Sequence, residues 1–135
     1  MALQYSVTVR NAQLDTVEST IGTTPILRIR TGAAPADCAT ADSGTVLAEM
    51  TLPSDWMAAA SGGSKALSGT WQDASANATG TAAHWRLYNS AGTTCHAQGT
   101  VTATGGGGDL TLDNTSIASG QSVTITSFTL TAGNA

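Results

Sequence analysis

Residues 82–101 alternate between apolar and polar side chains around one short turn, and this pattern restricts the fold more than any other feature. Residues at every second position lie on one face of a strand. The apolar set is Ala83, Trp85 and Leu87, and the polar set is His84, Arg86 and Tyr88. The intervening residues 90–92 end in Gly92, which can adopt the positive φ of a hairpin loop. The segment therefore predicts an antiparallel hairpin with one apolar and one polar face.

A loop over residues 90–92 also sets the register of this hairpin. It pairs Asn89 with Thr93, and every other pair follows. The predicted pairs are Leu87 with Cys95, Trp85 with Ala97, Arg86 with His96, and His84 with Gln98.

Further short strands are predicted on both sides of the hairpin. Apolar residues alternate, or share one face, over 26–30, 46–52, 67–71, 110–112 and 123–130, and Gly, Pro and Asp punctuate the segments between them. A bend near Thr126 and Ser127 would turn both halves of the last segment to the core. We expect seven or eight short antiparallel strands, arranged as a jelly roll or β-sandwich.

The N-terminal segment has a different period. Leu14, Val17 and Ile21 recur at helical spacing, and Gly22 follows as a stop, which predicts a helix over 10–21. An earlier start with Ser6 as the N-cap is one alternative, and a strand-like arm over 3–9 is another. One short turn of helix is also predicted over 54–60. We expect a single domain over 1–135, with an N-terminal arm and helix (1–22) and a β body (25–135).

Charge excludes several classes of protein. Only 10% of the 135 residues are charged, against about 25% in an average domain, and the net charge is −4. The five cations are scattered, so we expect no nucleic-acid partner. No apolar run approaches the roughly 18 residues of a membrane span, so we expect no membrane partner. Residues 1–10 lack the pattern of a secretory signal, which favours use without export.

Residues that could hold a metal or act as a nucleophile are few. The only histidines are His84 and His96, which the predicted register places diagonally on one polar face. Cys95 and His96 are neighbours on a strand and point to opposite faces, so they cannot form a dyad. Residues 62–65, Gly-Gly-Ser-Lys, lack the spacing of a phosphate-binding loop and are interpreted as a solvated loop. We expect no metal and no cofactor.

Paired carboxylates are the remaining route to catalysis. Asp109 and Asp113 flank one predicted strand, and Asp37 and Asp42 lie in the loop over 31–44, but neither spacing marks a catalytic pair. Cleft-forming aromatics are scarce, and we expect most of the tryptophans to anchor the core. The aromatic residues are Trp56, Trp71, Trp85, Tyr5, Tyr88 and Phe128. We therefore predict no enzymatic activity and no catalytic residue.

The two cysteines, Cys38 and Cys95, leave two alternatives open. Synthesis in the cytosol favours two buried free thiols, and release into an oxidising medium would permit a disulfide. We expect free thiols.

Four stretches resemble a known group of proteins. They are residues 26–35, 47–50, 68–72 and 117–125, and the likeness extends over nearly the whole chain. The chain resembles small structural proteins encoded in the head region of tailed bacteriophages, and is most similar to head decoration, or cement, proteins. The resemblance implies a β-rich domain that sits as a homotrimer on the outside of the shell, binds the major capsid protein and stabilises the expanded head. It identifies no contact residues.

From this resemblance we expect a virion protein on the capsid exterior, assembled in the cytoplasm of the bacterial host. The alternative is a tail or fibre-associated adhesion component that binds carbohydrate, for which an exposed platform of Trp56 or Trp71 would be needed. We expect residues 2–21 to contact other subunits or the shell, because their pattern differs from the β body and chain termini can reach a neighbour.

Overall fold

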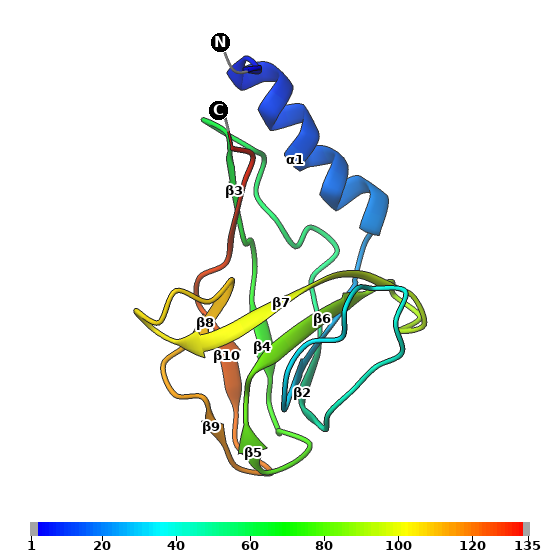
Figure 1. Ribbon diagram of the computed structural model, residues 1–135, viewed down its shortest axis with the longest axis vertical. Coiled ribbons are helices and arrows are strands. Elements are labelled where there is room, and N and C mark those ends of the chain that lie inside the picture. The colour runs from blue at the N-terminus through cyan, green and yellow to red at the C-terminus, as the bar shows by residue number, and fades with distance from the viewer. Residues whose placement is uncertain (1–2, 134–135) are drawn as a thin grey trace.

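The computed structural model describes residues 3–133 as a mainly β structure with one helix, α1 (Val7–Ile21) (Figure 1). Within the described residues there are eleven strands. They are β1 (Ile26–Arg30), β2 (Val46–Thr51), β3 (Ser64–Ala66), β4 (Trp71–Asp73), β5 (Gly80–Thr81), β6 (His84–Tyr88), β7 (Cys95–Ala103), β8 (Leu110–Leu112), β9 (Ser116–Ile117), β10 (Val123–Ile125) and β11 (Thr129–Thr131).

The main sheet has five strands in the order β2-β1-β6-β7-β8, and three two-stranded ribbons accompany it: β10–β4, β11–β3 and β5–β9. The prediction of seven or eight strands was too low. One reason is that no single strand covers 67–71: β3 ends before this segment and β4 begins at its last residue, with Gly69 at a φ of 74° between them. The prediction of an all-antiparallel arrangement was also wrong, because β7 and β8 are parallel.

The β6–β7 hairpin forms, but its register differs from the prediction by two residues. Leu87 pairs with Ala97 and Arg86 with Gln98, and the register shifts next to Tyr88, which pairs with Cys95. The turn is longer than three residues because the Asn89 backbone amide donates to Thr94 rather than Thr93. The shift of two keeps Trp85, Arg86 and Leu87 on their predicted faces, whereas the irregularity next to Tyr88 moves Cys95 to the other face.

Helix α1 begins at Val7, so the earlier of the two predicted starts is confirmed. Ser6 is the N-cap, and its hydroxyl accepts a 3.2 Å hydrogen bond from the Val9 amide. Gly22 ends the helix. The interpretation of residues 3–9 as a strand was wrong, and Met1 and Ala2 lie outside the described residues. The turn of helix predicted over 54–60 is absent.

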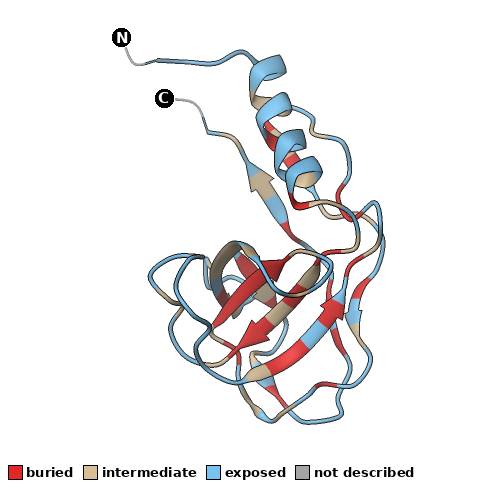
Figure 2. Cartoon of the chain, turned by 90° about the vertical axis from the view of Figure 1, so that its right-hand side faces the viewer, coloured by how far each residue is buried: buried red, intermediate tan, exposed pale blue. Residues whose placement is uncertain are grey.

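The core lies between the main sheet and the ribbons, and buried residues follow the strands of both (Figure 2). The three tryptophans anchor it as predicted. Trp71 packs between Trp56 and Phe128, and Trp85 meets the edge of Phe128 at 5.5 Å between ring centroids. The predicted bend after β10 is confirmed, because Ile125 and Phe128 are both buried on opposite sides of it.

All five residues of β6 are buried, although only one face was predicted to be. The loop over residues 31–44 covers the polar face. His84 donates through Nδ1 to the Gly32 carbonyl at 2.7 Å, and Arg86 is held by carbonyls of the same loop. The polar face of β6 is therefore an internal, hydrogen-bonded layer.

Candidate interaction surface

Helix α1 is attached to the segment before β3 by polar side chains. Three of them, spaced at 11, 15 and 18 on one side of the helix, accept hydrogen bonds from backbone amides of residues 57–63. The bonds join Asn11 to Gly63 at 2.9 Å, Asp15 to Ala60 at 3.0 Å, and Glu18 to Met57 at 2.9 Å. Leu14 and Ile21 are the buried apolar residues of the helix.

Lys65, on β3, adds two ion pairs to this attachment. Its side chain is 1% exposed, and its ammonium lies 2.7 Å from an Asp15 oxygen and 3.4 Å from a Glu18 oxygen. The hydrogen bond from Lys65, with that from the Ala60 amide, lowers the pKa of Asp15 below its ordinary value. Burial opposes the charge on Lys65, but these carboxylates outweigh it and raise its pKa. The interpretation of residues 62–65 as a solvated loop was wrong, because Ser64 and Lys65 lie in β3 and Gly63 and Lys65 are buried against the helix.

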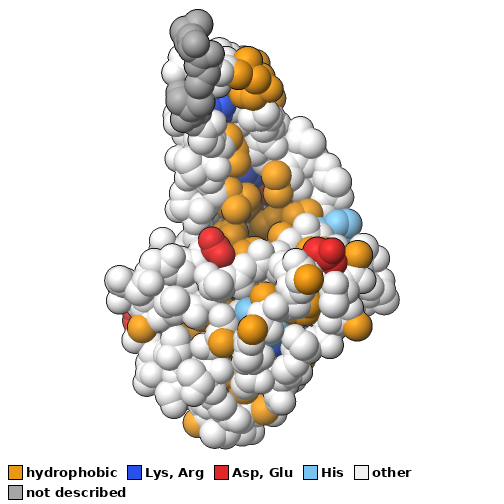
Figure 3. All heavy atoms as spheres, in the orientation of Figure 1, with side chains coloured by type: hydrophobic (Ala, Val, Ile, Leu, Met, Phe, Trp, Pro, Cys, Tyr) orange, Lys and Arg blue, Asp and Glu red, His pale blue; other side chains and the backbone are white. Residues whose placement is uncertain are grey.

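The N-terminal segment also carries exposed apolar side chains. Among the described residues, every large hydrophobic side chain that is exposed lies between positions 3 and 17. They are Leu3 (72%), Tyr5, Val7, Val9 (41%) and Val17 (37%). The spacing of Val17 with Leu14 and Ile21 had suggested a core position, which was wrong. Hydrophobic side chains gather along the arm of the molecule that carries α1 and at its junction with the β body (Figure 3).

A groove follows the C-terminal half of this helix. It has a volume of 280 Å³ and runs between Val17 and Ile21 of α1 and His96 at the start of β7. Large exposed apolar surfaces on a small protein mark places where a partner binds. The exposed apolar side chains of the helix and this groove form the candidate interaction surface, defined by Val7, Val9, Val17 and His96.

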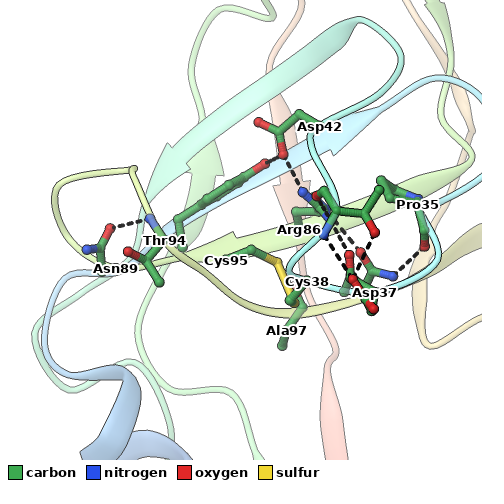
Figure 4. Close-up of a disulfide and its surroundings, with 12 residues drawn as sticks. Pro35, Asp37, Cys38, Asp42, Arg86, Asn89, Thr94, Cys95 and Ala97 are labelled. Atoms are coloured by element: carbon green, nitrogen blue, oxygen red, sulfur yellow. Dashed lines mark hydrogen bonds and ion pairs between the residues drawn. A yellow bond between two sulfur atoms is a disulfide. The ribbon is translucent and has the colours of Figure 1, made fainter.

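A second group of functional-type side chains surrounds a disulfide between Cys38 and Cys95, whose Cα atoms are 5.2 Å apart (Figure 4). The prediction of two free thiols was wrong. The corrected register explains why: Cys95 pairs with Tyr88 rather than Leu87, so it lies on the face that the loop over 31–44 covers. The disulfide therefore fastens this loop to the main sheet.

Arg86 is the centre of the polar layer beside the disulfide. Its guanidinium donates to the Asp42 carboxylate at 2.6 Å and to the carbonyls of Asp37 and Thr40 at 2.7 and 2.9 Å, while its Nε donates to Gln98 at 3.0 Å. These bonds satisfy a guanidinium that is almost fully buried. The cluster therefore holds the loop over 31–44 against the main sheet.

Asp42 receives donors from two strands in addition to this contact. Tyr88 donates through its hydroxyl at 2.6 Å, and Arg30 donates at 3.0 Å. Burial raises the pKa of Asp42, but the hydrogen bonds from Tyr88 and Arg86 outweigh burial and hold the pKa below its ordinary value. A carboxylate held in this way stays ionised and is a poor general acid.

The other residues weighed for chemistry are not assembled into a site. His84 is buried, whereas His96 is exposed beside α1. Asp109 accepts bonds from Thr100, and Asp113 accepts one from Thr104. Within residues 3–133, no group of three or more His, Cys, Asp or Glu side chains could hold a metal ion.

Two features of these sites were not predicted from the sequence. The spacing of Asn11, Asp15 and Glu18 was a visible signal for a polar helix face that binds backbone amides. The partners of Arg86 left no such signal, because two of them are carbonyls of an irregular loop.

The fold and this surface define a mainly β protein with a projecting N-terminal helix. No protein-family model matches the chain, and no curated protein or solved structure is similar to it. In the described part of the chain, no helix has the length and apolar character needed to cross a membrane.

Proposed function

We propose that the chain is a structural virion protein, a head decoration protein that binds the major capsid protein on the outside of a tailed-bacteriophage shell and stabilises it. The resemblance of residues 26–35, 47–50, 68–72 and 117–125 to that family supports this proposal. In the proposal the protein is not an enzyme and acts through its surfaces.

The observation that carries the proposal is the position of the exposed apolar side chains. Val7, Val9 and Val17 are exposed on a helix that polar side chains fix to the β body, so the helix holds them in defined positions. In this proposal the helix face packs against other copies of the chain, and the resulting homotrimer sits on the capsid. Burial of these side chains would contribute roughly 25 cal/mol per Å² of apolar surface.

We further propose that the main sheet and the ribbons form a β-sandwich of the jelly-roll kind that the family resemblance implies. The supporting contacts run across the core, where β2 approaches β4 and β8 approaches β10.

The alternative function, a tail or fibre adhesion component, would have been favoured by an exposed aromatic platform of Trp56 or Trp71. Trp56 and Trp71 are each 1% exposed, so they form no aromatic platform.

Sedimentation of the purified protein, followed by co-sedimentation with expanded phage heads, tests the proposal. The wild-type protein should form a trimer and label the capsid surface. Val9→Ser together with Val17→Ser should weaken trimerisation and head binding, with little change in thermal stability because both side chains are already exposed. Ala103→Ser, at an exposed position of β7, is the matched control and should bind as wild type.

Removing residues 1–10 gives a second measure. The deletion should greatly weaken head binding and lower the melting temperature only slightly. The slight loss of stability is expected because the Arg10 contact with the Ala132 carbonyl is removed. A protein that stays monomeric and never associates with heads would contradict the proposal.

A further inference from the structure

A cavity of 540 Å³ opens between β7, the loop before β8 and β11. This volume lies within the range of roughly 300–1,000 Å³ that is common for small-molecule sites. The wall is mixed: Trp85, Phe128 and Leu130 supply apolar surface, and Thr129 and Asp109 supply hydroxyl and carboxylate oxygens. The cavity is separate from the helix surface, which Val7, Val9 and Val17 define.

One polar atom in this wall has no partner. The side chain of Trp85 is 5% exposed, and its indole Nε1–H donates to no described residue. The other two indoles are satisfied: Trp56 donates to the Gly22 carbonyl at 2.9 Å, and Trp71 donates to carbonyls at 3.2 Å. A buried donor without a partner costs about 1–3 kcal/mol, so the Trp85 donor stands out as a point that a ligand could satisfy.

The Asp109 carboxylate lies next to this donor, across Gly99. A Cβ built on Gly99 would lie 2.8 Å from Trp85 Nε1 and 2.6 Å from Asp109 Oδ2. Any larger residue at this position would therefore fill the space between the indole and the carboxylate. The same two distances place Nε1 and Oδ2 within the span that one hydroxyl oxygen can bridge with normal hydrogen bonds.

Asp109 is also held in place for such a contact. Its Oδ2 accepts from the Thr100 amide at 3.0 Å and from the Thr100 hydroxyl at 3.2 Å. Among the described residues that line the cavity, Asp109 is the only charged one. A negatively charged ligand would therefore be repelled, and a neutral ligand is favoured.

From this geometry we propose that the cavity binds a neutral sugar, with one ring hydroxyl accepting from Trp85 Nε1–H and donating to Asp109. A hydroxyl is both donor and acceptor, so it matches the pair in a way that a carbonyl or an ammonium group cannot. The C–H face of a pyranose ring has the apolar character to pack against Phe128 and Leu130. This site adds a ligand to the proposed structural role and does not depend on where in a virion the protein sits.

The indole resonances of the ¹⁵N-labelled protein test the site directly. Three indole signals are expected, and Trp85→Phe assigns the Trp85 signal by removing it while keeping a ring in the core. Titration with methyl α-D-glucopyranoside and with methyl N-acetyl-β-D-glucosaminide should shift the Trp85 signal saturably with at least one of them. The signals of Trp56 and Trp71 should stay in place.

Asp109→Asn should weaken this binding about tenfold, as expected for a lost hydrogen bond to a charged group. The asparagine can still accept from the Thr100 amide, so the loop keeps its anchor. Asp113→Asn, the matched control on the other side of β8, should bind as wild type. A Trp85 signal that shifts with neither glycoside would overturn the proposal, as would equal affinities for wild type and Asp109→Asn.

Discussion

The guanidinium of Arg86 lies 2.6 Å from the carboxylate of Asp42, although 44 residues separate them in the chain. This contact joins β6, the first strand of the hairpin, to a loop that has no regular structure. It explains why both faces of β6 are buried: one packs in the apolar core, and the other is covered by a loop that the ion pair and the disulfide hold down.

The Arg86–Asp42 pair should be much more important for stability than an exposed pair. Arg86→Met removes the buried charge and leaves Asp42 and two loop carbonyls without this donor, so we expect a loss of about 3–5 kcal/mol in the free energy of unfolding. Arg28→Met is the matched control, because Arg28 pairs with the more exposed Glu49 at 2.6 Å and should lose no more than about 1 kcal/mol. Urea unfolding of both variants measures the difference. Equal losses would show that the loop is not clamped through Arg86.

Reduction of the disulfide should destabilise the protein. The bond between Cys38 and Cys95 closes a loop with a sequence separation of 57, and removing such a cross-link typically costs about 2–4 kcal/mol. Urea unfolding with and without a reducing agent gives this value. The double variant Cys38→Ser with Cys95→Ser should have about the stability of the reduced wild type, with and without the reducing agent. If the reducing agent left the wild-type midpoint unchanged, the disulfide would have no stabilising role.

Acid should unfold the protein through its partnered carboxylates. The folded-state pKa of Asp42 and that of Asp15 both lie below their ordinary value of 3.8. Their stabilising contribution is therefore complete above pH 3.8 and is lost as the pH falls through the lower folded-state values. Urea midpoints measured from pH 7 down to pH 2 should fall mainly at the acid end.

Asp42→Asn separates this effect from general acid sensitivity. The variant should be less stable than wild type at pH 7 and should lose less stability on acidification, because one of the groups that takes up a proton is gone. Asp113→Asn changes the same charge outside the cluster and should keep the wild-type slope. An Asp42→Asn slope as steep as wild type would assign the acid effect to other groups.

Trp85→Ala should cost roughly 3–5 kcal/mol, because it removes a large buried ring and its edge contact with Phe128. That is a large share of the roughly 5–15 kcal/mol that holds a typical domain folded. Thermal and urea unfolding measure the loss. A loss below about 1 kcal/mol, together with abolished head binding, would instead make Trp85 an interface residue.

The sequence predicted the parts of this fold that depend on local pattern. Alternation placed Trp85 and Leu87 on the core face, and this survived an error of two residues in register because strand faces repeat every two residues. The cap at Ser6 and the burial of Leu14 were visible for the same kind of reason. The polar layer was not predictable, because Arg86 obtains its partners from the carbonyls of Asp37 and Thr40, which any residue type could supply.

The candidate sites show the same division between local and long-range information. The exposure of Val17 was evident only after the helix was placed, because Val17 has the spacing of a core residue and yet is 37% exposed. The cavity beside Trp85 depends on Gly99 and Asp109, which meet the indole from two different places in the chain.

The polar attachment of α1 couples the stability of the helix to that of the 57–63 segment. The amides of Met57, Ala60 and Gly63 have their acceptors on the helix, so a fluctuation that lifts the helix exposes these amides together. A partner that binds the candidate interaction surface on α1 would slow that opening. Hydrogen exchange at these three amides, which the partner does not contact, would then become slower when the partner binds. The helix would in this way couple binding on α1 to the stability of the segment that leads into the β3–β11 ribbon.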